Sequence, residues 1–435
     1  MTDFSSIQHE LRVPRSVAQN CRFCATALRH TFVDLGMSPL CQTHIGPDQL
    51  HEMEPTYPLH AYVCDRCFLV QLQEFVSPQN IFSEYAYFSS YSSSWVEHAR
   101  RYTDMAIERF GLGPASKVIE IASNDGYLLQ HFVARGIPVL GVEPAANVAA
   151  AAALKGIPTE IRFLGRASAE TIAGTHGQAD LLLGNNVLAH VPDLNDFVAG
   201  LKRLLAPGGV ITMEFPHLRQ LMKCNQFDTI YHEHFSYFSC MAVEKVFSSH
   251  GLTLFDVEEL PTHGGSLRIY ARHAANLALP VGDRIRKLLQ TELDEGFMTL
   301  AHYRGFGEQV KATKRKLLSF LIDAKQRGKR VVGYGAPGKG NTLLNYCGIR
   351  TDFLDFTVDA NPYKQGKYTP GSRIPILSPD SIRQARPDYV LILPWNLRDE
   401  ISSAAAYISE WGGQFVVPIP EVEVLGAPEL AIRQR

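Results

Sequence analysis

The middle of the chain alternates short apolar runs with segments of helical periodicity. Apolar side chains dominate 118–121, and a polar loop at 123–126 leads into a helical pattern. The alternation returns with the apolar runs 138–142, 179–184 and 210–215. Short apolar runs separated by amphipathic helices are typical of parallel strands covered by helices. The pattern therefore predicts a doubly wound domain of the α/β class.

The segments between these runs supply the helices and two further strands. A short strand is expected near 158–160, and a loop at 261–265 is expected to feed a last strand. The helix at 194–205 is amphipathic, begins after the suitable N-cap Asp193, and is expected to stop at Pro207-Gly208-Gly209. Other helices are expected at 94–110, 127–134 and 145–155.

A charged helical region at 281–324 leads to a second β–α alternation. A strand, a glycine-rich turn and a helix follow one another from Lys329, and a second strand is expected at 356–359. The apolar runs predict only two further strands, 389–393 and 414–417. A complete six-stranded dinucleotide fold then does not fit, and we expect a half-domain that grips a diphosphate.

The length implies more than one domain. A chain of 435 residues exceeds what a single core usually organises. We expect a small N-terminal domain at 15–80, a central α/β domain at 81–280, and a helical connector with a C-terminal α/β domain at 281–435.

The composition argues against several classes of protein. The chain is 46% hydrophobic and 20% charged, with a net charge of -2, so it has no basic excess that would favour nucleic acid. No apolar run approaches the roughly 18 residues that a membrane-spanning helix needs. The first residues lack the basic and apolar regions of a signal peptide. We expect a cytoplasmic protein that binds neither nucleic acid nor a membrane.

Four of the eight cysteines form two C-x-x-C pairs, Cys21 with Cys24 and Cys64 with Cys67. Four thiolates in two such knuckles suit tetrahedral Zn²⁺ in a closed structural site. The 39 residues between the pairs exceed the usual spacing, and Cys41 is a substitute ligand without a partner. The alternative is two redox or free-thiol pairs. A module this small has little core, so we expect the metal to hold it together.

The loop at 123–126 carries the first candidate binding residues. Gly126 lets the backbone approach a ligand, and Glu120 lies near the ligand-binding edge of the sheet. Glu143 ends the next strand, where an acid can hold both hydroxyls of a ribose. The loop has one glycine and no G-x-G-x-x-G, so it suits a cationic or uncharged cofactor better than a pyrophosphate. The stretch resembles motif I of the S-adenosylmethionine-dependent methyltransferases.

Further candidate residues follow along the chain. Asn185 and Asn186 end the strand at 179–184, and His190 follows them towards the same edge. The linker 81–95 is dense in tyrosine and serine, and its Tyr85, Tyr87, Ser89 and Ser90 are either a lid over the cofactor or a packed loop.

The segment Tyr231-His232-Glu233-His234 concentrates acid–base chemistry. It is not H-E-x-x-H, so a zincin site is not expected. On an extended backbone, Tyr231 and Glu233 would face one side, and His232 and His234 the other. A histidine oriented by a carboxylate is a good general base. The alternative is a buried polar network without a catalytic part.

Taken together, these motifs resemble the sugar C-methyltransferases that act on nucleotide-linked keto-deoxysugars. The resemblance covers nearly the whole chain. The motifs are the C-x-x-C pairs, E-I-A-S-N-D-G-Y at 120–127, N-N-V-L-A-H-V at 185–191, Y-H-E-H-F-S-Y-F at 231–238, and G-Y-G-A-P-G-K-G-N-T-L-L-N-Y at 333–346. One departure is Pro337-Gly338, where relatives often carry other small residues.

The resemblance implies a zinc-binding N-terminal domain, a central Rossmann-like class I methyltransferase domain and a C-terminal Rossmann-like α/β domain that binds substrate. It implies S-adenosyl-L-methionine and Zn²⁺ as cofactors and His234 as the general base, with Tyr231, Glu233, His190 and Tyr85 beside it. The expected cofactor residues are Glu120, Ala122, Asn124, Gly126, Tyr127, Glu143, Pro144, Asn185 and Asn186. The expected substrate residues are Gly335, Lys339, Asn341 and Tyr237.

The implied reaction is methylation at C-3 of a dTDP-linked 4-keto sugar through an enolate, whose oxygen needs a donor such as His190 or a tyrosine. We expect a monomer or homodimer. An alternative is a nicotinamide-dependent nucleotide-sugar oxidoreductase or epimerase, because Gly333, Gly335 and Gly338 match G-x-G-x-x-G and Asp359 follows about 20 residues later. A third reading, an interaction or nucleic-acid module, is disfavoured by the balanced charge.

Overall fold

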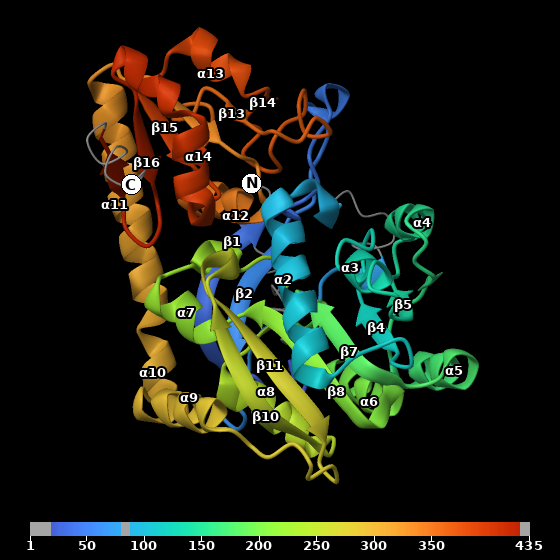
Figure 1. Ribbon diagram of the computed structural model, residues 1–435. Helices are drawn as coiled ribbons and strands as arrows, with labels where there is room; N and C mark the ends of the chain where they lie inside the picture. Colours follow the sequence, from blue (N-terminus) through green and yellow to red (C-terminus); the bar gives the residue numbers. More distant parts are fainter. Residues whose placement is uncertain (1–18, 80–87, 427–435) are drawn as a thin grey trace, which may run out of the picture.

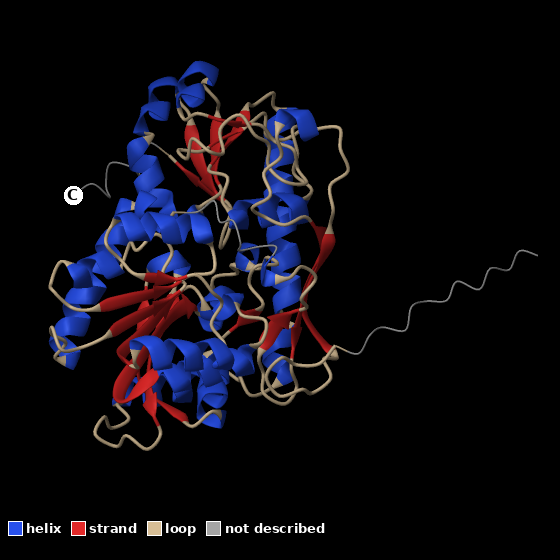
Figure 2. Ribbon diagram, turned by 90° about the vertical axis from the view of Figure 1, so that its right-hand side faces the viewer, coloured by secondary structure: helices blue, strands red, loops and turns tan. Residues whose placement is uncertain are grey.

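Three β-sheets form the framework of the protein in the computed structural model, which describes residues 19–79 and 88–426. Figure 2 shows the sheets as three separate groups of strands surrounded by helices. The α/β class predicted from the sequence is confirmed. Among the described residues, no helix is long and apolar enough to cross a membrane.

The N-terminal sheet is antiparallel and has the order β1-β2-β3-β9. Its strands are β1 (His30–Ser38), β2 (Tyr57–Val63), β3 (Val70–Leu72) and β9 (Ser236–Tyr237). The strand β9 comes from far along the chain, directly after the Tyr231–His234 segment. Its pairing with β3 ties the predicted catalytic segment to the cysteine-bearing part of the protein.

The middle sheet has seven strands in the order β10-β11-β8-β7-β4-β5-β6. The five strands from β8 to β6 are parallel, and the β10–β11 hairpin adds to β8 in antiparallel fashion. The strands are β4 (Val118–Ile121), β5 (Val139–Val142), β6 (Thr159–Glu160), β7 (Ala179–Asn185), β8 (Leu205–Pro216), β10 (Leu252–Leu260) and β11 (Ser266–His273).

Most predicted elements of the middle unit are present. The helices are α2 (Ser93–Phe110), α3 (Leu129–Val133), α4 (Ala146–Leu154), α5 (Arg166–His176), α6 (Leu194–Leu204), α7 (Leu218–Lys223) and α8 (Cys240–Ser249). Asp193 caps α6 by accepting from the Asp196 amide, as predicted. The prediction that this helix ends before Pro207-Gly208-Gly209 is confirmed. The helix ends at Leu204, and these residues lie within β8, beside an irregularity in its pairing with β7.

The C-terminal sheet has six strands in the order β14-β13-β12-β15-β16-β17, and only the edge strand β17 is antiparallel. The strands are β12 (Val331–Tyr334), β13 (Thr357–Val358), β14 (Ile376–Leu377), β15 (Tyr389–Ile392), β16 (Gln414–Val417) and β17 (Glu423–Leu425). The prediction of only two strands after the second was wrong. The missed strands β14 and β17 have two and three residues, too few to show periodicity.

The helices of the C-terminal third are the connector helices α9 (Asp283–Asp294), α10 (Leu300–Arg304) and α11 (Phe306–Gln326), followed by α12 (Gly338–Cys347), α13 (Asp380–Ala385) and α14 (Arg398–Ala404). In Figure 1, α11 runs along one side of the molecule, from α9 and α10 to the C-terminal sheet.

One hydrophobic core serves both the first and the last sheet. Phe32 of β1 stacks on Phe306 of α11, with ring centroids 4.5 Å apart, and both are buried. The same cluster continues through Leu317 and Leu321 to Val331 of β12. Full burial of one such side chain stabilises a fold by roughly 1.5–3 kcal/mol. The N-terminal strands therefore do not rely on a core of their own.

Candidate active site

A cavity of about 900 Å³ opens where the three units meet. It lies at the carboxyl ends of β4, β5 and β7, where open α/β sheets bind ligands. Its wall also includes Leu40 and His44 of the N-terminal part and Gly338 and Lys339 of α12. A cavity of this volume is within the range that holds a small-molecule ligand.

Seven of the nine predicted cofactor residues line this cavity. They are Ala122, Asn124, Tyr127, Glu143, Pro144, Asn185 and Asn186. The loop after β4 is held in place by the Glu143 carboxylate, which accepts from the backbone amides of Asn124 and Ala145, both at 2.9 Å. Each carboxylate oxygen uses one lone pair in this way and keeps another for a ligand hydroxyl.

Glu120 does not line the cavity. It is fully buried in β4, and neither of its oxygens has a hydrogen-bond partner among the described residues. Burial and the nearby carboxylates of Glu143 and Asp125 raise its pKa well above the usual value. Glu120 therefore favours the protonated form.

Gly126 also lies outside the residues that line the cavity, and its packing gives a separate reason for a glycine. Its φ is +74°, which an L side chain rarely adopts. A Cβ atom at this position would lie 2.3 Å from Cδ1 of Ile157. The turn and the close packing of Ile157 therefore require a glycine here, and the approach of a ligand to its backbone stays a prediction.

The segment from Tyr231 to His234 is a turn and not an extended strand. The His234 amide donates to the Tyr231 carbonyl at 2.9 Å, which closes the turn. Tyr231, Glu233 and His234 therefore line the cavity together, and the predicted division into two faces was wrong. His232 turns away, with Nε2 3.3 Å from the Pro58 carbonyl.

His234 is buried beside the cavity with a defined tautomer. Its Nδ1 lies 3.0 Å from the Thr229 carbonyl, which only accepts, so Nδ1 carries the proton and Nε2 has a free lone pair. Burial and the neighbouring His190 lower its pKa well below the usual value, so the ring is neutral at pH 7. A neutral imidazole with a free Nε2 can accept a proton from a ligand.

His190 joins His234 from the end of β7. The Phe235 amide donates to the Ala189 carbonyl at 2.7 Å, and this bond brings the two segments together. The rings of His190 and His234 are edge to face, with centroids 4.7 Å apart. Burial lowers the pKa of His190 to about 4.

Glu233 carries a perturbed carboxyl group. Burial raises its pKa to about 7, and the Cys41 thiol lies 3.6 Å from Oε1. The ring of Tyr231 lies 4.1 Å from that of His234, whereas Tyr237 is buried outside the cavity wall. Tyr85 and Tyr87 lie outside the described residues. The Ser89 amide and the Ser90 hydroxyl bind the side chains of Asn124 and Asp125.

Among the predicted substrate residues of the glycine-rich turn, Lys339 alone lines the cavity. Its Nζ donates to Asn396 Oδ1 at 2.7 Å and lies 4.5 Å from the centre of the Trp395 ring. A Cβ on Gly335 would lie 2.6 Å from Pro394, and Asn341 is buried with its amide bound to the Cys41 carbonyl. Protein packing therefore closes off Gly335 and Asn341, whereas Gly338 lines the cavity.

His263 is one of the titratable residues of the cavity wall to which the sequence analysis gave no role. It follows β10 and bonds Asn186. Arg162, Lys364 and Lys367 add positive charge to the wall. The only signal for His263 was a histidine before Gly264-Gly265, a pattern that by itself fits an ordinary surface turn.

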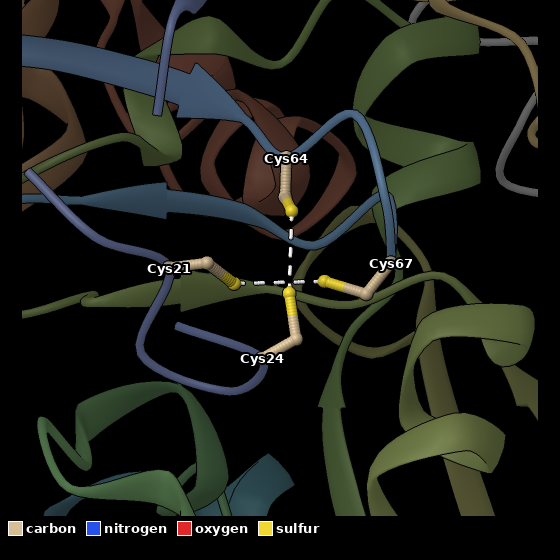
Figure 3. A group of neighbouring side chains, drawn as sticks. All are labelled: Cys21, Cys24, Cys64 and Cys67. Carbon is tan, nitrogen blue, oxygen red and sulfur yellow. Dashed lines mark hydrogen bonds between the residues drawn. The ribbon is translucent and has the colours of Figure 1, made fainter. Parts of the chain in front are cut away.

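The four predicted metal ligands come together at one point (Figure 3). Their sulfur atoms all lie within 4.8 Å of one another, with Cys21 to Cys67 and Cys24 to Cys64 both 3.5 Å apart. Tetrahedral zinc with bonds of about 2.3 Å would place sulfurs roughly 3.8 Å apart. The donor set therefore fits a closed Cys₄ zinc site, and Cys41 lies elsewhere, beside Glu233.

Comparisons with known families match three consecutive parts of the chain. Residues 21–82 match a model described as "Putative zinc binding domain", 95–257 a "Methyltransferase domain", and 261–420 a "C-methyltransferase C-terminal domain". The last match covers the glycine-rich turn in which the alternative placed a nicotinamide cofactor.

Two kinds of relative are found among known proteins. The C-methyltransferase NovU of Streptomyces niveus is 39% identical over 410 residues, covering 94% of this chain and 97% of NovU. An uncharacterized methyltransferase of Mycobacterium leprae is 26% identical over 26% of this chain and 42% of its own length.

Two of the solved structures found resemble part of the chain. The PH0226 protein of Pyrococcus horikoshii is 14% identical with a TM-score of 0.34, over 46% of this chain and 99% of its own. The DhpI complex with SAH is 20% identical with a TM-score of 0.30, over 43% of this chain and 92% of its own.

Proposed function

Because the chain belongs to the C-methyltransferase family and is an S-adenosylmethionine-dependent C-methyltransferase, we propose that it methylates C-3 of a dTDP-linked 4-keto-deoxysugar. One observation carries the proposal: His234 lines the cavity as a neutral ring with an unprotonated Nε2. The division into units at 15–80, 81–280 and 281–435 is part of the same proposal.

The residues at the ends of β4 and β5 fit the cofactor. The free lone pairs of Glu143 suit two ribose hydroxyls, and Val142, Phe163 and Leu164 supply an apolar wall for an adenine ring. When bound, S-adenosylmethionine supplies a methyl group carried by a positively charged sulfur. In this proposal Asn124, Tyr127, Asn185 and Asn186 orient it towards His234.

The substrate carbon needs an adjacent ketone, because only then does its C–H bond become acidic enough. His234 Nε2 takes the proton, and the electron pair of the C–H bond moves to the ketone oxygen to give an enolate. The enolate carbon would then form the new C–C bond to the methyl group, while the bond from this group to sulfur would break with its electron pair staying on sulfur, so that S-adenosylhomocysteine is the leaving group. The ketone is restored, and the proton leaves His234 for solvent. Tyr231, His190 and Glu233 surround the reacting atoms.

The positive charge of the wall supports a nucleotide diphosphate as the rest of the substrate. Lys339 is half-buried, and Lys367 is exposed at the mouth of the cavity. Lys364 is also in the wall, with Nζ 2.9 Å from the Ala336 carbonyl. Lysine ammonium groups bind phosphate oxygens as point charges. In this proposal the diphosphate binds along the edge of the C-terminal unit that carries these lysines.

The zinc site has a structural part in this proposal. Its four thiolates leave no position for water or substrate, so it does not act as a Lewis acid on the ketone. Cys64 directly follows the strand β2, and Cys67 precedes β3, which pairs with β9 next to His234. The metal thereby fixes the strands on which the catalytic turn rests.

The test combines binding with product analysis. Calorimetric titration with S-adenosylhomocysteine should show tight binding, and titration with NAD none. Incubation with S-adenosylmethionine and dTDP-4-keto-6-deoxyglucose should then give a product with one added methyl group, whose position NMR identifies. The variant Glu143→Gln should weaken S-adenosylhomocysteine at least tenfold, because hydrogen bonds to a charged group contribute about 1.5–3 kcal/mol. Binding of NAD without S-adenosylhomocysteine would replace this proposal with the oxidoreductase alternative.

A further inference from the structure

His263 lies in the cavity wall between the cofactor side and the catalytic side. Its Nε2 is 3.0 Å from Nδ2 of Asn186, at the end of β7, and its ring is 5.0 Å from that of Trp95. It is also close enough to His234 that its positive charge would lower the pKa of that residue. No motif or family segment described above assigns it a role.

The backbone at His263 is held in an unusual conformation. Its φ is +55°, in the left-handed region that residues other than glycine rarely adopt. Three contacts fix the loop: the Thr262 hydroxyl donates to Glu214 at 2.8 Å, Gln226 Nε2 donates to the Gly264 carbonyl at 2.7 Å, and the His217 amide donates to the Gly265 carbonyl at 3.0 Å. Strained conformations held by their surroundings concentrate at active sites.

The contact with Asn186 selects the tautomer of His263. An amide Nδ2 only donates, so Nε2 of His263 accepts and the ring proton is on Nδ1. Nδ1 makes no hydrogen bond with the described residues. Burial and the positive charge of Lys339 lower the pKa of His263 to about 4, which keeps the ring neutral at pH 7. The ring therefore keeps an unused N–H donor in the cavity wall.

The proposed reaction needs such a donor. Because burial holds the pKa of His234 low, it is a weak base, and it can remove a proton from carbon only if the developing enolate oxygen is stabilised. A neutral imidazole that donates one hydrogen bond can stabilise this oxygen without carrying a positive charge beside the cationic cofactor.

We propose that His263 is a catalytic residue whose Nδ1–H donates a hydrogen bond to the ketone oxygen of the substrate as it becomes the enolate oxygen. The inference rests on the proposed function, since it assumes a ketone substrate. His263 forms no covalent bond and transfers no proton: the C–H proton goes to His234, and the negative charge stays on the oxygen that His263 binds.

The test measures proton abstraction separately from methyl transfer. Wild-type protein with S-adenosylhomocysteine should exchange a proton next to the ketone of dTDP-4-keto-6-deoxyglucose in D₂O, followed by NMR. His263→Ala should slow this exchange and kcat by about 10²–10³, the usual loss of one oxyanion donor, with little change in KM or in S-adenosylhomocysteine affinity. His263→Gln keeps an N–H donor and should restore part of the rate. The matched control is His232→Gln, outside the cavity wall, which should exchange as wild type does.

A second readout needs no substrate. Nitrogen NMR of the free protein, with His263→Gln to assign the ring signals, should show the proton on Nδ1. A proton on Nε2 would overturn the inference. If the wild-type protein exchanges the proton and methylates the substrate, and His263→Ala exchanges at the wild-type rate, the role of His263 is overturned while the proposed function stands. A wild-type protein that does neither would overturn the proposed function and the inference with it.

Discussion

The Nδ1 atom of His234 lies 3.0 Å from the backbone oxygen of Thr229, five residues earlier in the chain. This contact determines which ring nitrogen is free, because a carbonyl can only accept the Nδ1 proton. The free nitrogen belongs to a side chain in the cavity wall, beside His190 and Tyr231. The tautomer thus follows from a local contact. The surroundings of the ring depend in addition on the distant segment that carries His190.

The variant His234→Gln should lose C-methylation and keep its cofactor. Glutamine has no unprotonated ring nitrogen, so proton abstraction should fall by about 10²–10⁴, the usual contribution of a general base. Product formation and calorimetry with S-adenosylhomocysteine check the two parts. His232→Gln is the matched control in the same turn. Turnover by His234→Gln near the wild-type rate would remove His234 from the role of base.

Glu233 should make stability depend on pH. Its pKa is raised from 4.5 to about 7 by burial, so the folded state prefers the protonated acid. This stabilisation is fully present below pH 4.5 and is lost as the pH rises through about 7. At pH 8 the neutral variant Glu233→Gln should therefore have a higher melting temperature than wild type, and its unfolding free energy should be larger by up to about 3 kcal/mol. At pH 4.5 both quantities should be close to those of the wild type.

Melting curves of both proteins at several pH values test this prediction. Glu170→Gln is a suitable control, because Glu170 is exposed and pairs with Arg203 on the surface. If the melting temperatures of Glu233→Gln and wild type differ by the same amount at pH 4.5 and at pH 8, the raised pKa of Glu233 is contradicted.

Removing the metal should destabilise the N-terminal strands. Elemental analysis should find one zinc per chain in the wild type and none in Cys64→Ser, since a closed site needs all four thiolates. Loss of a structural metal belongs to the large class of destabilisations, roughly 4 kcal/mol or more. Cys224→Ser is the matched control, because Cys224 lies outside the cluster. A Cys64→Ser protein that keeps its zinc would show that other residues bind it.

Gly126→Ala should cost more stability than another glycine with a similar backbone. At Gly126 a methyl group meets Ile157 at 2.3 Å, whereas at Gly136, with φ +68°, it meets nothing within 4 Å. Both variants carry the left-handed strain of roughly 1 kcal/mol, and Gly126→Ala adds overpacking of about 1–3 kcal/mol. Thermal unfolding compares the two. The double variant Gly126→Ala with Ile157→Val should recover part of the difference, and no recovery would argue against the clash.

The sequence by itself determined the local elements and the metal ligands. The spacing of apolar residues marked β4, β5, β7 and the helices between them, because strand and helix periodicities are properties of neighbouring residues. The two C-x-x-C pairs identified the zinc ligands without any knowledge of the fold, because few other arrangements use four cysteines in this pattern. Very short strands such as β14 could not be predicted from the sequence, since their pairing depends on the neighbouring strand and not on their own residues.

The tertiary structure alone decided how the site is assembled. Nothing local indicated that β9 would join the N-terminal sheet, that Cys41 would lie beside Glu233, or that His263 would enter the cavity. The direction of each side chain in the Tyr231–His234 turn depended on bonds to Thr229, Pro58 and Ala189. The sequence therefore identified most of the candidate residues, and the contacts between distant segments set their tautomers, pKa values and positions.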